Sequence, residues 1–132
     1  MNENFTCVSL AALIKTRKFD WVDPSITSEH FSIPDRLYTN YILFHFGKYT
    51  SSKEAVKRMQ VAGYEPANFH ELLLWEEWNG KDVVVALGFI LEVHNSSHTP
   101  FLQGDGSKRY LYLDRLDHDW SANCCFLAVL KS

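Results

Sequence analysis

The adjacent cysteines Cys124 and Cys125, with His118 nearby in the sequence, are residue types that could support nucleophilic catalysis. A histidine within hydrogen-bonding reach of a thiol can accept its proton and leave a reactive thiolate. A cysteine beside an apolar strand, however, more often acts as a small hydrophobic side chain. We therefore expect these cysteines to pack in the core, and the Cys–His pair remains the alternative.

Metal binding has little support in the spacing of the candidate ligands. His94 and His98 fall at a strand end and in a turn, where a spacing of four residues does not bring two side chains to one face. The 3 cysteines include no C-x-x-C pair. The aspartates between residues 105 and 119 do not form the D-x-[DN]-x-[DN]-G run of a calcium loop. We expect no metal site and no other cofactor.

The common catalytic templates are also missing from the sequence. It contains no G-x-S-x-G, no G-x-G-x-x-G and no phosphate-binding loop. We therefore do not expect an enzyme.

Charge and hydropathy limit the partners. The net charge is −3, and no basic cluster is longer than KTRK at 15–18, which argues against binding to nucleic acid. The opening residues do not match a secretory signal, and no apolar run is long enough to span a bilayer. The default expectation is a cytoplasmic protein that does not insert into membranes, with surface display by a route that needs no signal peptide left open.

Side chains typical of binding surfaces gather between residues 101 and 125. Rigid rings and the planar guanidinium group bury much area for little loss of conformational entropy. The residues of this kind are Phe101, Tyr110, Tyr112, Arg115 and His118. Trp120 lies in the same stretch, but a single Trp among polar neighbours usually anchors a loop to the core, and we expect that role for it.

Two helices are predicted from their start signals. Ser51 with Glu54 forms the pattern of a capping box, and Gly63 ends the helix. Asn68 with Glu71 repeats the pattern, and this helix is expected to continue until Asn79-Gly80. Both read as amphipathic helices that pack on a sheet.

The rest of the chain predicts a shorter helix, an irregular segment and a set of strands. The short helix covers Leu10 to Ile14 after a Ser9 cap, and residues 19–36 read as an irregular segment anchored by its rings. Strands are expected at 37–46, 83–93, 110–113 and 124–131, with turns at 95–100 and 104–107. The run at 83–93 should be buried on both faces. Together these elements predict one α+β domain over residues 1–132.

Three segments of the chain resemble a known family. AGYEPANFHELLLWEEWNGKDVVVALG (62–88), GDGSKRYLYL (104–113) and WSANCCFLAV (120–129) are similar to the variable proteins of diversity-generating retroelements from candidate bacterial phyla and nanoarchaea. The resemblance covers roughly residues 50–132. It implies a C-type lectin-like fold of the formylglycine-generating-enzyme-like subclass, with two helices packed on a small, mostly antiparallel sheet.

The resemblance also implies a constant scaffold. The positions that match it are Gly63, Pro66, Ala67, Glu71, Leu72, Leu73, Ala86, Leu87, Gly88, Trp120 and Phe126 to Val129. The chain departs from the family pattern at Cys125, where an Arg is usual, and at Leu130, where a basic residue is usual.

In such proteins an error-prone reverse transcriptase rewrites the C-terminal part at template adenines. Randomising the two adenines of an Asn codon yields many residue types but never Met, Trp, Lys, Gln or Glu. From Arg109 to Phe126 only Trp120 belongs to that excluded set, which agrees with the resemblance. Alternation along a strand would direct Leu111, Leu113 and Leu127 to the core and Tyr110 and Tyr112 to solvent.

The resemblance thus predicts a variable ligand-binding region at about 101–125. Its ligand is expected to be a protein or a cell-surface molecule, recognised without calcium or sugar, because EPAN at 65–68 is not the Glu-Pro-Asn motif of sugar-binding lectins. The predicted face consists of Phe101, Gln103, Tyr110, Tyr112, Asp114, Arg115, Leu116, Asp117, His118, Asp119, Ser121, Asn123 and Cys124. Two alternatives remain: an enzyme like the formylglycine-generating enzymes, which needs two separated reactive thiols, and a fixed structural or interaction domain.

Overall fold

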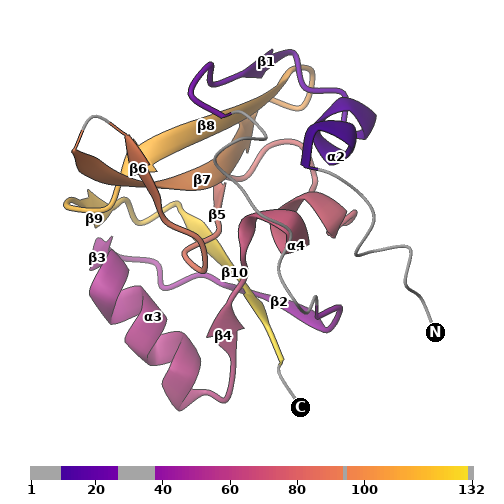
Figure 1. Cartoon of the computed structure of the whole chain (residues 1–132). Helices are drawn as coiled ribbons and strands as arrows, with labels where there is room; N and C mark the ends of the chain where they lie inside the picture. The colour runs from indigo at the N-terminus through magenta and orange to yellow at the C-terminus, as the bar shows by residue number, and fades with distance from the viewer. Residues whose placement is uncertain (1–9, 27–37, 94, 131–132) are drawn as a thin grey trace.

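The computed structural model describes residues 10–26, 38–93 and 95–130, which form an α+β arrangement of short helices around one main sheet (Figure 1). The expectations for Ser9, for His94 and for residues 27–36 of the predicted irregular segment therefore lie outside the described residues. The helices are α2 (Leu10–Thr16), α3 (Ser52–Val61) and α4 (Phe69–Leu74). The strands are β1 (Trp21–Val22), β2 (Tyr41–Phe44), β3 (Thr50–Ser51), β4 (Glu65–Pro66), β5 (Val84–Val85), β6 (Leu91–Val93), β7 (Ser96–Gly104), β8 (Arg109–Arg115), β9 (Asp119–Trp120) and β10 (Cys125–Val129).

The main sheet has the strand order β1-β8-β7-β5-β10-β2, and β4 and β6 pair beside this path with β10 and β7. β1 with β8 and β5 with β10 are parallel pairs. The other pairs in this sheet are antiparallel, as expected for a mostly antiparallel sheet. β3 and β9 form a separate antiparallel pair.

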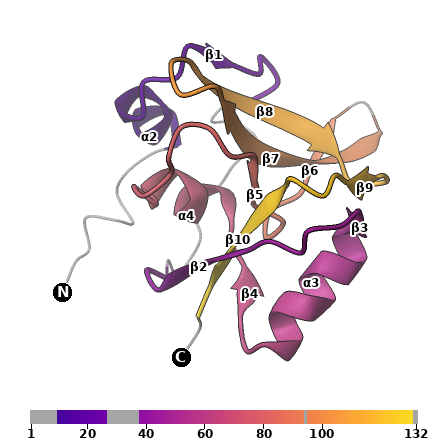
Figure 2. The ribbon, with the colours of Figure 1, turned by 180° about the vertical axis from the view of Figure 1, so that it is seen from behind.

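β10 lies at the centre of the core and is buried along its whole length. Cys125, Leu127 and Val129 contact a cluster that includes the buried side chains of α2 and α4, which we call the α4-side core. Phe126 and Ala128 contact a second cluster that includes Ala55 and Met59 of α3, the α3-side core. The sheet therefore separates two cores, with α2 and α4 on one side and α3 on the other (Figures 1 and 2). The expected buried closing strand is confirmed.

α3 begins and ends where the sequence predicts. The Ser51 side chain accepts a hydrogen bond from the Glu54 N–H at 3.0 Å, and Gly63 follows the helix with φ 93°, a conformation that favours glycine. Only half of the predicted capping box forms, because the Glu54 carboxylate accepts a hydrogen bond from Arg58 instead. The exposed face of α3 is thus held by an (i, i+4) ion pair.

α4 is shorter and more buried than the sequence predicts. Its reciprocal Asn68–Glu71 capping box is present, but the helix ends at Leu74, well before Asn79-Gly80, and Trp75 takes an extended conformation with its ring buried. The prediction of an amphipathic helix is wrong here, since His70 and Glu71 are only 3% and 2% exposed. Glu71 can be buried because its carboxylate accepts hydrogen bonds from backbone N–H groups, that of the N-cap among them.

The predicted strand at 83–93 is two strands, β5 and β6, joined by a turn. Gly88 in that turn donates its N–H to the Ala67 carbonyl at 2.8 Å, and a Cβ there would lie 2.4 Å from the Pro66 oxygen. This close backbone approach requires glycine and interrupts the apolar run. Burial on both faces is confirmed for Val84, Val85 and Ala86.

The turn predicted at 95–100 is also wrong, because residues 96–100 lie in β7 and pair with β6 or β8. Polar side chains can occupy this strand because its backbone pairs with the neighbouring strands β6 and β8. The turn at 104–107 is confirmed: the Asp105 side chain accepts hydrogen bonds from the N–H groups of Ser107 and Lys108.

The short helix at α2 and the expected strands at β2 and β8 are confirmed as well. In the described part of the chain, no helix has the length and apolar character needed to cross a membrane.

Candidate ligand-binding face

The antiparallel pairing of β7 with β8 assigns neighbouring residues to opposite faces of the sheet. Phe101 pairs with Tyr112 and Gln103 with Tyr110, whereas Leu102 pairs with Leu111. Leu102 and Leu111 are 3% and 0% exposed and belong to the α4-side core. The partners on the other face are half-buried or exposed. The alternation predicted from the sequence is thus present, and it collects several predicted site residues on one face.

Aromatic rings form a continuous row across this face. The Tyr112 ring centroid lies 5.2 Å from that of Phe101 in a stacked arrangement and 5.1 Å from that of Trp21. Tyr110 lies 5.9 Å from Tyr112, and Phe101 meets the buried Trp120 edge-on at 6.2 Å. Such spacings are typical of favourable aromatic pairs. We call Trp21, Phe101, Gln103, Tyr110 and Tyr112 the aromatic face.

Trp21 is the member of this face that the sequence reasoning missed. It is 42% exposed and reaches the face because β1 pairs in parallel with β8, opposite Tyr110. The segment was expected to be anchored by its rings, but nothing in its residue spacing indicates which strand it joins. A long-range parallel pair has no local sequence signal of this kind.

Asp114 and His118 continue the aromatic face toward β9. Asp114 follows Tyr112 by two residues on β8, and the His118 Nε2 atom lies 3.1 Å from its carboxylate. The two side chains form an ion pair when the imidazole carries a proton. The His118 ring also packs 4.6 Å from the Trp120 ring, and its Nδ1 lies 2.9 Å from the Asp119 carbonyl oxygen. The Asp114–His118 contact therefore ties the loop to the end of the ring row.

Arg115, Leu116 and Asp117 point elsewhere. The Arg115 guanidinium lies 2.6 Å from the Asp117 carboxylate, and this hydrogen bond lowers the pKa of Asp117. By strand alternation Arg115 lies on the face opposite Asp114. Leu116 packs against the α3-side core, and its N–H donates to the Ser97 carbonyl. These residues border a hollow of about 450 Å³ beside residues 95–97 and not the aromatic face.

Trp120 is a core residue, as expected. It is 3% exposed, and its indole N–H donates to the Ser52 hydroxyl at 2.8 Å, which in turn donates to the Leu116 carbonyl. Asp119, Ser121 and Asn123 are exposed at the adjoining positions. Cys124 is 8% exposed and packs in the α3-side core, so it lies beneath the surface and does not belong to the predicted face.

The two described cysteines are poorly placed for catalysis. Cys124 and Cys125 pack into opposite cores, so their thiols do not share a cleft. Burial, with smaller contributions from Asp82 and Cys124, raises the pKa of the Cys125 thiol. The Cys124 Sγ lies 3.6 Å from the Ser121 hydroxyl, and among the described residues neither thiol contacts a histidine. Within residues 10–26, 38–93 and 95–130 there is also no group of three or more His, Cys, Asp or Glu that could hold a metal ion.

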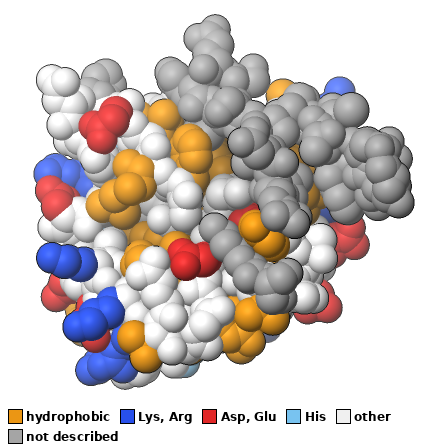
Figure 3. Space-filling view, turned by 60° about the horizontal axis from the view of Figure 1, so that its bottom comes forward, with side chains coloured by type: hydrophobic (Ala, Val, Ile, Leu, Met, Phe, Trp, Pro, Cys, Tyr) orange, Lys and Arg blue, Asp and Glu red, His pale blue; other side chains and the backbone are white. Residues whose placement is uncertain are grey.

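A second exposed surface lies between α3 and β2. Phe44, Phe46 and Val61 line a hollow of about 310 Å³ there, with Lys57 and Arg58 at its edge. Figure 3 shows Lys and Arg side chains gathered on the side of the molecule where α3 lies. None of the predicted site residues lines this hollow.

The chain was compared with models of known protein families, with curated proteins and with solved structures, and none of the three comparisons found a match.

Proposed function

We propose that this protein is a ligand-binding domain in which a constant C-type lectin-like body carries a binding face that a retroelement diversifies. The proposed face has a constant part, which is Trp21, Phe101 and Gln103 of the aromatic face. Its variable part consists of Tyr110, Tyr112, Asp114, His118, Asp119, Ser121 and Asn123. The body consists of the two cores on either side of the sheet. The ligand would be a protein or a cell-surface molecule recognised by shape and aromatic contacts.

One observation carries the proposal. Tyr110, Tyr112 and Asp114 alternate along β8 with Leu111 and Leu113, so a single strand presents outward residues while it holds the body together. Exposed positions tolerate most substitutions at about 0.5 kcal/mol or less, whereas large-to-small changes in a core cost about 2–5 kcal/mol. A face of this kind can change its side chains without loss of the fold.

Position 103 refines the extent of the variable region. Gln103 is exposed opposite Tyr110, yet Gln is a residue that adenine mutagenesis of an Asn codon cannot yield. Lys, which stands at position 108, also cannot arise from an Asn codon in this way. We therefore expect positions 103 and 108 to be constant and the variable positions to begin at or after residue 109.

The catalytic alternative is disfavoured by the cysteines. A formylglycine-generating-enzyme-like reaction needs accessible, separated thiols around a cleft. Here the described thiols are buried on opposite sides of β10, and one has a raised pKa. The fixed interaction domain remains as a second reading, because the same aromatic face could serve one constant partner.

The test is to sequence this gene and its downstream DNA from many cells of the source population. We expect substitutions to concentrate in the codons for the outward positions 110, 112, 114, 118, 119, 121 and 123, with codons 111, 113 and 120 unchanged. Each variable codon should align with adenines in a nearby near-duplicate of the segment. A uniform segment with no near-duplicate would reject diversification and leave a fixed binding site.

A further inference from the structure

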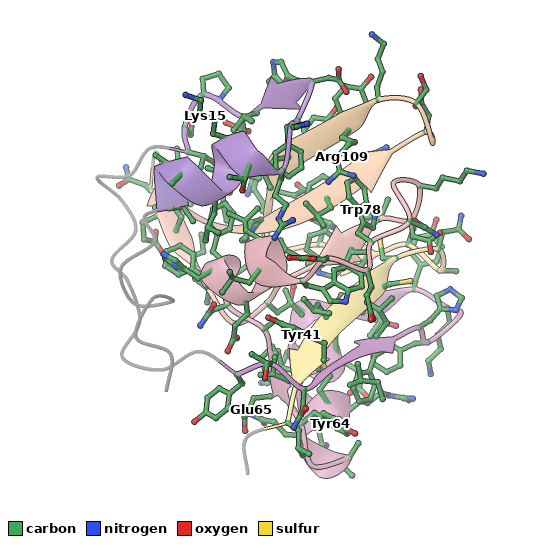
Figure 4. All side chains as sticks on the ribbon, turned by 90° about the vertical axis from the view of Figure 1, so that its right-hand side faces the viewer. Lys15, Tyr41, Tyr64, Glu65, Trp78 and Arg109 are labelled. Carbon is green, nitrogen blue, oxygen red and sulfur yellow. The ribbon has the colours of Figure 1, made fainter. Side chains whose placement is uncertain are left out.

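A small cavity lies on the side of the β7–β8 pair that faces away from the aromatic face. It measures about 40 Å³, and its lining includes Arg17, Arg109 and the rings of Phe19, Trp75 and Trp78. Arg109 shares the strand alternation of Leu111, which turns its side chain toward α2 and α4. In Figure 4 Arg109 and Trp78 lie close together on this side of the molecule. The cavity is thus separate from the proposed binding face.

The Arg109 guanidinium is held in place by its surroundings. Its central carbon lies 4.8 Å from the centroid of the Trp78 ring and 5.7 Å from that of Phe19. Its Nε donates to the Arg17 carbonyl at 3.1 Å, and Trp78 is itself fixed by a hydrogen bond from its indole N–H to the Asp82 carbonyl. The terminal nitrogens of Arg109 donate to no described residue. A pre-oriented cation, whose two terminal nitrogens have no hydrogen-bond acceptor among the described residues, therefore lines the cavity.

Arg17 supplies a second positive charge. Its Nε donates to the Leu73 carbonyl near the end of α4. Its terminal nitrogen lies 3.6 Å from the Glu76 carboxylate, whose side chain is 76% exposed against 22% for that of Arg17. This contact is long, and an exposed ion pair of this kind contributes little. The cavity lining thus carries two positive charges, of Arg17 and Arg109, and one negative charge, of Glu76.

We propose that this cavity binds the carboxylate group of a small organic acid or of a polypeptide C-terminus. A planar guanidinium fork matches the two oxygens of a carboxylate in its own plane. The cavity of about 40 Å³ has room for a small head group, and comparison with phosphate tests whether it prefers the planar carboxylate to a tetrahedral anion. The remainder of the ligand would extend outward past Glu76 and the aromatic rings. The proposal does not depend on diversification of the opposite face.

The first test is an NMR titration of the native protein that follows the Trp78 indole N–H and the Arg109 Nε–H resonances. The probes are sodium acetate, N-acetylalanine as a model of a chain terminus, and N-acetylalaninamide, which lacks the carboxylate. Sodium chloride and sodium phosphate at matched ionic strength are the controls. We expect saturable shifts with acetate or N-acetylalanine, none with the amide, and binding of chloride or phosphate at least about tenfold weaker. If only N-acetylalanine binds, the source is a chain terminus, whereas equal binding of both acids indicates a free acid.

The proposal is wrong if neither resonance shifts to saturation with either acid, or if chloride or phosphate binds as tightly. The first result would leave Arg109 with a purely structural role, and the second would make the cavity a general anion site without preference for a carboxylate.

Two variants sharpen the test. Arg109→Lys keeps the charge but loses the planar fork, and we expect carboxylate affinity to fall about tenfold or more. Lys108→Gln removes a charge from the neighbouring exposed position and should leave the affinity unchanged, because that side chain does not line the cavity. An equal loss in both variants would reduce the effect to general electrostatics and reject the site. Should Arg109→Lys fail to fold, the titration of the native protein still decides.

Discussion

The two faces of the β7–β8 pair use the same backbone for opposite purposes. On one face Leu102 and Leu111 are enclosed by α2 and α4, while on the other Gln103, Tyr110 and Tyr112 meet solvent. Both faces belong to the same two strands. The difference in burial between them therefore comes from the register of the pair and from the helices that cover one side. A shift of the register by one residue would exchange the two sets. The pairing therefore separates a part of the molecule that must stay constant from a part that can vary.

The largest expected effect comes from breaking the covered face. Leu111→Ala removes a side chain that is 0% exposed and should lower the free energy of unfolding by about 2–5 kcal/mol, through lost burial and the cavity left behind. The neighbouring Tyr110→Ala should cost about 1 kcal/mol or less, since it loses one ring contact and remains in reach of water. Urea denaturation of both variants measures the difference. Similar losses would mean that the two faces are equally part of the body.

The next effect concerns Trp120, which lies among exposed residues but belongs to the body. Trp120→Phe removes the indole N–H, whose hydrogen bond the Ser52 hydroxyl accepts, and it also removes part of a buried ring. We expect the free energy of unfolding to fall by about 1–3 kcal/mol. Ser121→Ala at the next, exposed position is the matched control and should stay within about 0.5 kcal/mol. Thermal melts of the two variants test whether the variable segment is interrupted here. A neutral Trp120→Phe would contradict the assignment of this ring to the core.

The covered side should also respond to pH through His70 of α4. Burial lowers the pKa of His70 from its usual 6.5, and its Nε2 makes no hydrogen bond. The unfolded chain therefore binds a proton more readily than the folded one, so stability is full above about pH 6.5 and falls as the pH drops below it. Urea midpoints between pH 8 and pH 5 should show this slope in the native protein. His70→Gln should reduce the slope, whereas His45→Gln at an exposed position should leave it in place.

Local sequence signals predicted the elements that are fixed by local contacts. Ser51 and Asn68 mark the starts of α3 and α4 because each side chain accepts a hydrogen bond from an N–H three residues later. The apolar run of β10 likewise indicates burial, since all five of its residues face one core or the other. Such signals depend only on residues close in sequence.

The features that were predicted wrongly or missed all depend on distant contacts. α4 stops early because Trp75 turns into the core, and the 83–93 run breaks because Gly88 meets the backbone of Ala67. Trp21 joins the aromatic face through a parallel pair with β8, and Cys124 leaves the predicted face for the α3-side core. In each case the partner lies far along the chain, where periodicity and spacing carry no information. The part of the site that lies on the β7–β8 hairpin was therefore predictable. The contribution of Trp21, which depends on a long-range pair, was not.

The smallest expected effect tests the open face most directly. Gln103→Ser shortens an exposed side chain opposite Tyr110 that makes no hydrogen bond with the described residues, so the free energy of unfolding should change by no more than about 0.5 kcal/mol. Leu102→Ser, one position earlier, places a hydroxyl in the α4-side core and should cost several times as much. Urea denaturation of the pair compares the same new residue at adjacent positions of one strand that lie on opposite faces. If Gln103→Ser proved as costly as Leu102→Ser, the open face would also be stabilising the fold, and the division of this strand pair into a covered and an open face would be wrong.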